Sequence, residues 1–403
     1  MGQPLHDAPA RRVRPGHAAP AGAYADQRRA GHGTGAMTSA RIVRAVVRRL
    51  SFALTTPYRL SSGDRDRFDP IVIELIDADG RSGWGEALIA PGYTHESVES
   101  GWQVANTLAE RLVGMDLAQA SAAAMPWLVP NPGTASATLA AIDMLAADPL
   151  LTLRQDAVIP LLAPLQAHGA GAIAEEVDRL VGEGFRTLKV KVGYRWQDDA
   201  ERIAQIQNAV AGRATPRLDA NRGYSRADGI AFASRLDPRG VELFEQPCGS
   251  DDWDANAAVA AASTVPVMLD ESVWGVADID RAATIANVGF VKLKLKKIGS
   301  NAMLQGALER IRDLGMTPVL GDGVSMEIGC WMEACVAVQA IDNAGEMNGF
   351  LKCRERLFAN PLQVVGGAIR LPAGYWPEVD RDMLRSHTEA EAAYAATARV
   401  AVR

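Results

Sequence analysis

The sequence predicts an α/β fold in which a parallel (β/α) barrel follows a smaller α+β region. Three acidic residues, Asp219, Glu245 and Asp270, each end a short apolar run. They recur about every 25 residues, which is the length of one strand, helix and return loop in such a barrel. Two lysine-rich strands, TLKVKVG and FVKLKLKKIGS, flank them at a similar spacing. Because the carboxyl ends of barrel strands meet at one face, we expect these charged side chains to lie together.

The first 36 residues differ in composition from the rest of the chain. They are rich in Arg, Ala, Gly, Pro and His and nearly lack branched aliphatic residues, so they offer little apolar surface to bury. We expect residues 1–36 to form a disordered tail or to precede the true start, with Met37 as initiator. A targeting peptide is the competing interpretation, but the segment lacks the apolar core of a secretory signal.

Residues 40–155 are predicted to form the α+β region. The stretches RIVRAVVRRLSFAL and PIVIELIDADGRSGWGEAL have the pattern of strands, and the DADG turn between the apolar arms of the second stretch predicts a hairpin. Helices are expected over 94–112 and 135–147.

The barrel is predicted over residues 156–365, and residues 366–403 are expected to return to the first region. In TLKVKVG the side chains alternate, so Lys189 and Lys191 share one face of the strand and the valines share the other. A barrel strand is apolar where it faces helices, which leaves both ammonium groups pointing into the barrel mouth. Strands are expected near Val158, Leu188, Arg217, Glu242, Val267, Val291, Pro318 and Asn348.

Composition argues against several classes of partner. The net charge of −6 gives no reason to expect nucleic acid or an acidic membrane surface, and no apolar run reaches the length of a membrane span. The four cysteines have neither CxxC spacing nor the density of a disulfide framework, which suits a reducing cytoplasm. We therefore expect a cytoplasmic protein that binds neither nucleic acid nor a membrane.

Carboxylates at three neighbouring strand ends favour a hard divalent cation, because such ions prefer oxygen ligands. Mg²⁺ is the expected metal, and Mn²⁺ is the alternative. In a competing interpretation the barrel is not an enzyme, and the acids and lysines form a structural ion-pair network. Removal of Lys191 would then leave a buried carboxylate without its partner and destabilise the fold.

Five motifs of the barrel region together resemble the enolase superfamily, and within it the muconate-lactonizing-enzyme subgroup. They are KxK, DAN, EQP, DES and KxxKxG, at positions 189–191, 219–221, 245–247, 270–272 and 294–299. The subgroup contains muconate cycloisomerases, dipeptide epimerases, N-acylamino acid racemases and o-succinylbenzoate synthases. The resemblance implies a modified TIM barrel, (β/α)7β, with an N-terminal α+β capping domain.

The resemblance also implies that the cap closes over the barrel mouth. It would bring the cap loops 58–64 and 89–95 to the substrate, although by sequence alone these loops could equally be ordinary connections. It further implies a homo-oligomer that acts on a small-molecule carboxylate.

By the same resemblance the three strand-end carboxylates would bind the metal. Asp219, Glu245 and Asp270 would be the ligands, supported by Asn221 and Glu271. Enolase-superfamily enzymes combine such a metal with a Lys or His base to form an enediolate. None of the six histidines lies in the later strands, so lysines are the only proton-transfer pair on offer.

Lysines on two opposed strands would transfer the proton. Lys191 corresponds to the acid/base on one face of the substrate, and the ammonium of Lys189 beside it would lower its pKa. On the last lysine strand, either Lys292 or Lys294 could reach the opposite face; the family commonly has Asn at position 292. We favour Lys294, because it stands three residues before Lys297 in the KxxKxG motif.

Other polar residues near the strand ends have less defined roles. Lys296 and Lys297 are expected to form a solvated strand exit. Asp322 in VLGDGVS is either an extra polar group at the seventh strand or a turn residue. Glu346 and Asn348 stand where dipeptide epimerases of the family often carry Asp-x-Asp to hold the ammonium group of the substrate.

The predicted reaction is removal of the proton α to a carboxylate, leading to racemisation or epimerisation of an amino-acid derivative. Glu346 alone is a weaker ammonium anchor than two aspartates, so an N-acyl amino acid fits at least as well as a dipeptide. Muconate-type cycloisomerisation and o-succinylbenzoate-synthase-type dehydration are the alternatives, because the metal ligands do not decide what the enediolate does next.

Overall fold

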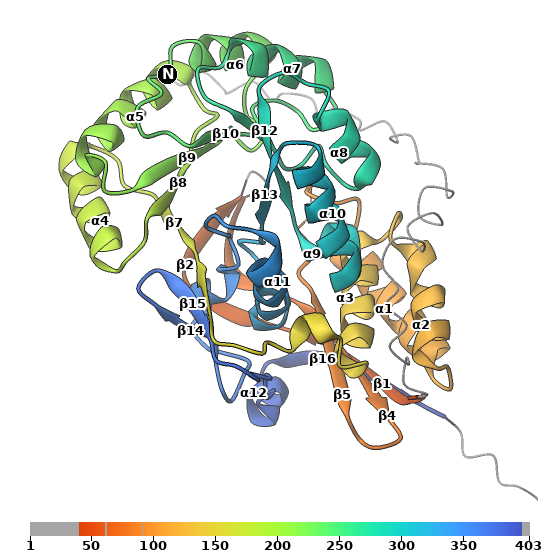
Figure 1. Ribbon diagram of the computed structural model, residues 1–403. Helices are drawn as coiled ribbons and strands as arrows, with labels where there is room; N and C mark the ends of the chain where they lie inside the picture. The colour runs from red at the N-terminus through yellow and green to blue at the C-terminus, as the bar shows by residue number, and fades with distance from the viewer. Residues whose placement is uncertain (1–39, 61–62, 91, 397–403) are drawn as a thin grey trace, which may run out of the picture. The chain divides into compact units, whose positions relative to one another are not determined.

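In the computed structural model, residues 40–60, 63–90 and 92–396 are described (Figure 1). The predicted tail, residues 1–36, lies outside them. An antiparallel sheet with three helices, which we term the capping domain, accompanies a parallel barrel surrounded by helices. The predicted α/β class, a TIM-like barrel with an α+β cap, is confirmed. Across the described ranges, no helix combines the length and apolar character that a membrane span requires.

The capping domain is built on a four-stranded antiparallel sheet, to which the end of the chain contributes an edge strand. In sheet order its strands are β16 (Thr388–Ala395), β1 (Ile42–Leu50), β4 (Ile71–Asp77) and β5 (Ser82–Ala87). The DADG sequence forms the turn between β4 and β5, where Gly80 has a φ of 78°. Three helices pack on the apolar residues of this sheet: α1 (Val98–Leu112), α2 (Leu117–Ala124) and α3 (Pro132–Leu145).

A separate hairpin, β2 (Phe52–Leu60) and β3 (Gly63–Phe68), connects β1 to β4. Its first strand lies against the chain that follows the last barrel strand, because Leu54 and Cys353 form an isolated antiparallel bridge. Residues 61–62, at the tip of this hairpin, lie outside the described residues. The expectation that loop 58–64 reaches the substrate is therefore left open.

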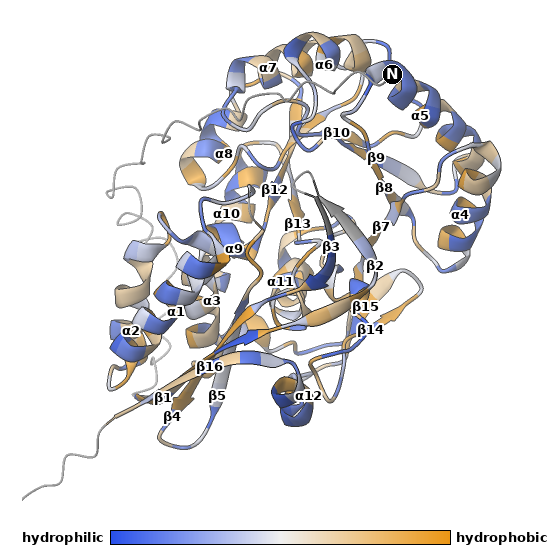
Figure 2. Cartoon of the chain, turned by 180° about the vertical axis from the view of Figure 1, so that it is seen from behind, coloured by the Kyte–Doolittle hydropathy of each residue, from blue (hydrophilic) through white to orange (hydrophobic). Residues whose placement is uncertain are grey.

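Seven parallel strands form one sheet in chain order. They are β7 (Leu162–Leu165), β8 (Thr187–Lys191), β9 (Thr215–Asp219), β10 (Leu243–Glu245), β11 (Val267–Leu269), β12 (Val288–Leu293) and β13 (Thr317–Leu320). The main helices outside them are α4 (Ala170–Gly182), α5 (Trp196–Val210), α6 (Arg226–Ala233), α7 (Trp253–Ala262), α8 (Val276–Ala282), α10 (Asn301–Asp313) and α11 (Glu327–Ala340). Figure 2 draws α4 in both hydropathy colours, as expected for a helix with one face on the barrel and one in solvent.

A short segment at Gly345 and Glu346, which we term the closing segment, takes the place of an eighth strand. The Leu162 N–H donates to the Gly345 carbonyl and the Glu346 N–H donates to the Leu320 carbonyl, both at 2.9 Å. The segment therefore joins β7 to β13 and closes the barrel. The close approach requires Gly321, whose φ is 130° and whose Cβ, if it had one, would lie 2.7 Å from the Glu346 backbone.

The first barrel strand begins later than predicted. Val158 lies on β6 (Ala157–Pro160), which pairs antiparallel with β15 (Ala368–Leu371) in a small sheet that also contains β14 (Gln363–Val365). This strand ends at Pro160, which has no N–H to continue a ladder, and the chain enters the barrel at Leu162. The remaining short elements are η2 (Met125–Trp127), η3 (Pro149–Leu151), α9 (Leu295–Ile298), η4 (Gly349–Lys352) and α12 (Arg381–Ser386).

Alternation along the barrel strands separates apolar side chains from charged ones. Leu188 and Val190 are fully buried in the core between strands and helices, as expected from TLKVKVG. Leu243, Met268 and Val319 form a small apolar cluster of their own. Two residues further along, two of the same strands reach Glu245 and Asp270. The charged side chains therefore gather at the carboxyl ends of the strands.

Candidate active site

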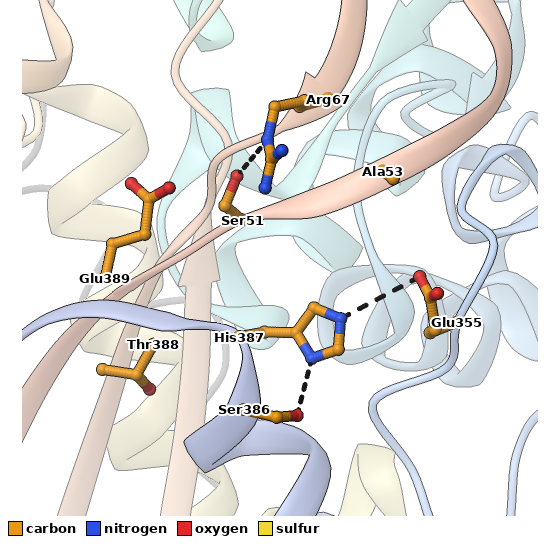
Figure 3. Close-up of a pocket in the computed structure, with 8 residues that line it drawn as sticks. All are labelled: Ser51, Ala53, Arg67, Glu355, Ser386, His387, Thr388 and Glu389. Atoms are coloured by element: carbon orange, nitrogen blue, oxygen red, sulfur yellow. Dashed lines mark hydrogen bonds and ion pairs between the residues drawn. The ribbon is translucent and has the colours of Figure 1, made fainter.

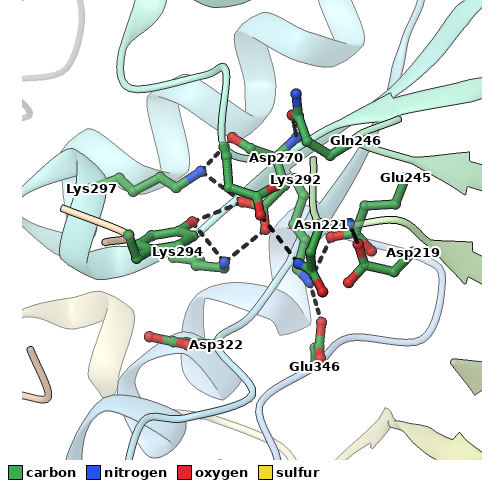
Figure 4. Close-up of polar contacts among 12 residues, drawn as sticks. Asp219, Asn221, Glu245, Gln246, Asp270, Lys292, Lys294, Lys297, Asp322 and Glu346 are labelled. Atoms are coloured by element: carbon green, nitrogen blue, oxygen red, sulfur yellow. Dashed lines mark hydrogen bonds and ion pairs between the residues drawn. The ribbon is translucent and has the colours of Figure 1, made fainter. Parts of the chain in front are cut away.

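Three carboxylates meet at the ends of neighbouring strands (Figure 4). Asp219 and Glu245 are register partners on β9 and β10, and Asp270 directly follows β11. All three are at most 2% exposed. Burial, together with the adjacent Asp219, raises the pKa of Glu245 to about 7. Against the effect of burial, Lys189 and Lys191 hold the pKa of Asp219 well below its usual range.

The two lysines of β8 reach this cluster at different depths. The Lys189 ammonium lies 2.9 Å from Asp219 Oδ2 and 3.2 Å from Glu245 Oε2, and its side chain is only 6% exposed. The Lys191 ammonium lies 2.7 Å from Asp219 Oδ2 and hydrogen-bonds Asn221, and its side chain is 42% exposed. Although burial lowers the pKa of Lys189, the surrounding carboxylates raise it well above its usual value. Lys189 is thus an enclosed cation, whereas Lys191 lies at the opening.

Two lysines that follow β12, the strand on the other side of the cluster, contact Asp270. Lys294 Nζ donates to Asp270 Oδ2 at 2.8 Å, and Lys297 Nζ donates to Asp270 Oδ1 at 2.7 Å. Burial lowers the pKa of Lys294, but Asp270 and Tyr93 raise it further, so that it lies well above its usual value. β8 and β12 thus present ammonium groups from the two sides of the strands that bear the carboxylates.

The expectation that Lys296 and Lys297 form a solvated strand exit is wrong. They are 9% and 3% exposed, because the chain turns from β12 directly into α9, which is buried throughout. Lys296 pairs with Asp322 at 2.7 Å, and Lys297 pairs with Asp270. The strand exit therefore supplies two internal ion pairs.

Lys292 lies deeper in the barrel than Lys294. Its ammonium is 3.3 Å from Glu245 Oε1 and also hydrogen-bonds Glu346 Oε2, and the residue is 2% exposed. Lys294 instead contacts Asp270 and the capping domain. The two lysines that sequence left as alternatives thus have different partners.

Tyr93, from the cap loop 92–95, is a site residue that sequence reasoning did not single out. Its hydroxyl donates to Asp270 Oδ1 at 2.9 Å and accepts from Lys294 Nζ at 2.7 Å. Burial raises the pKa of Tyr93 well above its usual value, so the hydroxyl keeps its proton. The Arg222 guanidinium anchors the same loop by donating to the Gly92 carbonyl at 3.2 Å. The sequence offered little indication of Tyr93: the resemblance implied that loop 89–95 reaches the substrate, but it did not point to any residue of that loop.

The other polar residues predicted near the strand ends differ in whether they join the charged cluster. Asn221 joins the cluster, since its amide donates to Glu271 Oε1 at 3.1 Å, and Glu346 joins it through Lys189 at 2.8 Å. Asp322 both pairs with Lys296 and accepts the Val324 N–H, so it is an ion-pair partner and a turn residue at once. Asn348 points elsewhere and donates to the Leu162 carbonyl at 3.0 Å, where it helps to close the barrel.

The donor set fits a divalent cation, although the side chains are not gathered around one. Among the described residues, no three His, Cys, Asp or Glu side chains are grouped closely enough to hold a metal ion, because lysine ammonium groups lie between the carboxylates. Three buried carboxylates at adjacent strand ends are nevertheless the ligands that Mg²⁺ prefers. Beside them Glu271 Oε2 is buried without a hydrogen-bond partner in the structure, which leaves an oxygen available to a cation or its water.

A surface pocket of about 330 Å³ lies elsewhere (Figure 3). It is lined by Ser51, Ala53, Arg67, Glu355, Ser386, His387, Thr388 and Glu389. His387 stacks on Phe52 with ring centroids 4.5 Å apart, and none of the lining residues belongs to the charged cluster. The pocket lacks the convergent carboxylates and lysines of the strand ends, so we assign the candidate active site to those strand ends.

The family of the chain follows from comparison with known proteins. A family model described as "Enolase C-terminal domain-like" matches residues 172–375, which include all five motifs. The chain belongs to the enolase superfamily. This membership makes it an enzyme, and the alternative of a non-enzymatic ion-pair barrel is wrong. The sequence-based resemblance to the mandelate racemase/muconate lactonizing group is confirmed.

Relatives within the superfamily include different reaction types. The chain is 30% identical to a hydrophobic dipeptide epimerase of Citrifermentans bemidjiense, over 75% of this chain and 84% of the relative. It is 27% identical to the o-succinylbenzoate synthase of Geobacillus stearothermophilus, over 85% of this chain and 95% of the relative. A dipeptide epimerase of Cytophaga hutchinsonii, crystallised with Mg and the dipeptide D-Ala-L-Val, shares the fold, with a TM-score of 0.79 and 23% identity over 88% of this chain and 99% of that one.

Proposed function

We propose that this enzyme is a Mg²⁺-dependent racemase or epimerase that inverts the carbon α to the carboxylate of an amino-acid derivative. The observation that carries the proposal is the placement of Lys191 and Lys294. Lys191 reaches the cluster at Asp219 from the end of β8, and Lys294 reaches it at Asp270 from the position that follows β12. An acid/base group on each side of a bound acid is what inversion requires, since one removes the α proton and the other returns a proton to the opposite face.

The metal would be held by Asp219, Glu245 and Asp270. When bound, Mg²⁺ stabilises negative charge on the substrate carboxylate as a Lewis acid. Lys189 adds a fixed positive charge, because it is enclosed and surrounded by carboxylates. These cations together lower the cost of the charge that develops when the α proton leaves.

Each proton-transferring lysine is held in position by a neighbour. Lys191 hydrogen-bonds Asn221, and Lys294 donates to the Tyr93 hydroxyl at 2.7 Å. The capping domain, through Tyr93, thereby sets the direction of the Lys294 ammonium. Leu243, Met268 and Val319 form a buried apolar cluster on strands of the barrel, which would exclude water from the inner side of the site.

The relatives support an amino-acid derivative as substrate, either a dipeptide or an N-acyl amino acid. One relative is named a hydrophobic dipeptide epimerase. A second candidate function is dehydration, which is favoured by the similarity to an o-succinylbenzoate synthase over nearly its full length. Cycloisomerisation would use the same residues and is the third candidate function.

The test is exchange of the α proton in D₂O with Mg²⁺, followed by NMR or mass spectrometry on pooled N-acyl amino acids, dipeptides and muconate-like acids. Wild-type enzyme should wash in deuterium with inversion, and Lys191→Ala and Lys294→Ala should lose it. Lys191→Arg is the matched control: it keeps the charge beside Asp219 but cannot release its proton. Inversion that persists in Lys191→Arg would overturn the two-lysine assignment, whereas Lys294 alone can still exchange the α proton of the enantiomer that faces it.

A further inference from the structure

The ion pair between Lys292 and Glu346 links β12 to the segment that closes the barrel. Lys292 Nζ hydrogen-bonds Glu346 Oε2, and Lys189 Nζ donates to the same oxygen at 2.8 Å. Lys292 and Glu346 are 2% and 8% exposed. One carboxylate oxygen, buried beside Glu245, is therefore shared by two ammonium groups.

This arrangement changes what the closing segment offers to a ligand. Glu346 is the carboxylate that this segment directs into the cluster, and it is already paired with Lys189 and Lys292, both of which also contact Glu245. A ligand ammonium that approached Glu346 would meet two like charges within a few ångströms, in a buried site where such repulsion is poorly screened. An amide brings no charge to the same place, and its carbonyl oxygen can accept a hydrogen bond from an ammonium group.

We propose that Lys292 sets the substrate class of the enzyme by occupying Glu346, so that the site accepts amino acids whose nitrogen is acylated and rejects those that end in a free ammonium. Lys292 is a positioning residue in this scheme, since it acts through Glu346. The inference rests on the proposed function for the type of substrate, and it narrows that proposal to N-acyl amino acids.

Glu271 is the other carboxylate that could receive an ammonium. Its Oε1 already accepts from Asn221 at 3.1 Å and lies 3.6 Å from the Arg222 guanidinium, while its Oε2 has no hydrogen-bond partner in the structure. If Glu271 anchored a free ammonium, wild type would bind the glycyl ligands at least as tightly as the N-acetyl ones, and substitution of Lys292 would leave that ratio unchanged. The two arrangements therefore predict different results for one variant.

The experiment compares N-acetyl-L-leucine with glycyl-L-leucine, which differ by a single ammonium group, and repeats the comparison with lysine and glutamate in place of leucine. Dissociation constants are measured by calorimetry with Mg²⁺ for wild type, Lys292→Met and Lys292→Arg. Wild type should bind the N-acetyl ligand at least tenfold more tightly than its glycyl partner. In Lys292→Met that ratio should fall at least tenfold, and in Lys292→Arg, which keeps the charge, it should persist.

Several outcomes overturn the inference: no preference in wild type, a preference for the glycyl ligands, an unchanged ratio in folded Lys292→Met, or no binding of either class. If Lys292→Met does not fold, Lys292→Gln, which also removes the charge, takes its place in the comparison. Deuterium exchange separates the two proposals. Selective binding without exchange removes the proposed function and leaves the inference, whereas exchange that favours glycyl ligands removes only the inference.

Discussion

The Tyr93 hydroxyl accepts a hydrogen bond from Lys294 Nζ at 2.7 Å, and its ring centroid lies 4.2 Å from the same ammonium. The two residues are 201 positions apart in the chain. The same hydroxyl donates to Asp270 Oδ1, so one cap residue contacts both a proposed metal ligand and a proposed acid/base. The position of the cap loop and the orientation of Lys294 are therefore linked through Tyr93.

Tyr93→Phe should lower kcat/KM about 10- to 100-fold, because hydrogen bonds to charged groups contribute about 1.5–3 kcal/mol. The ring and its contact with Lys294 would remain, but both hydrogen bonds of the hydroxyl would be lost, so the melting temperature should fall as well. Steady-state kinetics and a thermal melt check both expectations. Tyr194→Phe is the matched control, since Tyr194 is 78% exposed. Equal activity of Tyr93→Phe and wild type would remove the positioning role.

Mg²⁺ should raise the thermal stability of the wild-type protein. Binding to the folded state alone stabilises by about 2.7 kcal/mol at a concentration of 100 times Kd. Glu245→Gln removes one proposed ligand and should abolish most of the shift, whereas Glu175→Gln, on the exposed face of α4, should retain it. Melting curves with and without EDTA give the answer without reference to any substrate. A shift that survives in Glu245→Gln would place the metal elsewhere.

Glu333 on α11 should make stability depend on pH. It accepts the Leu295 and Asp322 N–H groups at 2.8 and 3.0 Å, and burial raises the pKa of Glu333 to about 8. Between about pH 4.5 and 8 the folded state then holds a proton that the unfolded state has released, so its contribution to stability falls as pH rises, by up to about 1.4 kcal/mol per unit.

Glu333→Gln should remove this contribution and flatten the profile. Denaturant unfolding at pH 5, 6.5 and 8 measures the slope for both proteins. The exposed Glu201→Gln is the control and should keep the wild-type slope. Parallel profiles for wild type and Glu333→Gln would contradict the raised pKa.

Gly321→Ala should destabilise the barrel closure by at least about 2 kcal/mol, because alanine is strained at a φ of 130° and its Cβ would lie 2.7 Å from the Glu346 backbone. Gly306→Ala offers the opposite case. Gly306 lies within α10 and has open space around it, so alanine there should stabilise by about 0.5–1 kcal/mol. Chemical unfolding of both variants checks the pair. A Gly321→Ala protein as stable as wild type would show that the closing segment shifts without cost.

Much of the charged cluster could be predicted from the sequence. In a repeating βα unit, residues at equal intervals along the chain lie at equivalent strand ends. Asp219 and Glu245 are register partners for that reason, and Lys189 and Lys191 face inward because side chains alternate along a strand. The same local rules failed at Val158. A run of strand-forming residues does not say which sheet it will join, and the sheet changes only after Pro160.

Local sequence rules also failed to predict the environment of Lys297. A lysine near a strand exit is usually solvated, but α9 buries this one, and Asp270 and two backbone carbonyls accept from it. Tyr93 was missed for a related reason. Its loop precedes the barrel by many residues, and nothing in the loop itself reveals that its hydroxyl reaches Asp270.

The sequence by itself determined the α/β barrel, the strand-end carboxylates and the two lysine strands, because hydrophobic periodicity and repeat spacing act over short distances along the chain. Only the tertiary structure decided which charges pair. Lys292 and Glu346 are 54 positions apart and Tyr93 and Lys294 are 201 apart, so their contacts depend on how the barrel closes and where the cap loop comes to rest. The KxxKxG motif favoured Lys294 over Lys292, and these packing relationships show that the two lysines have different partners.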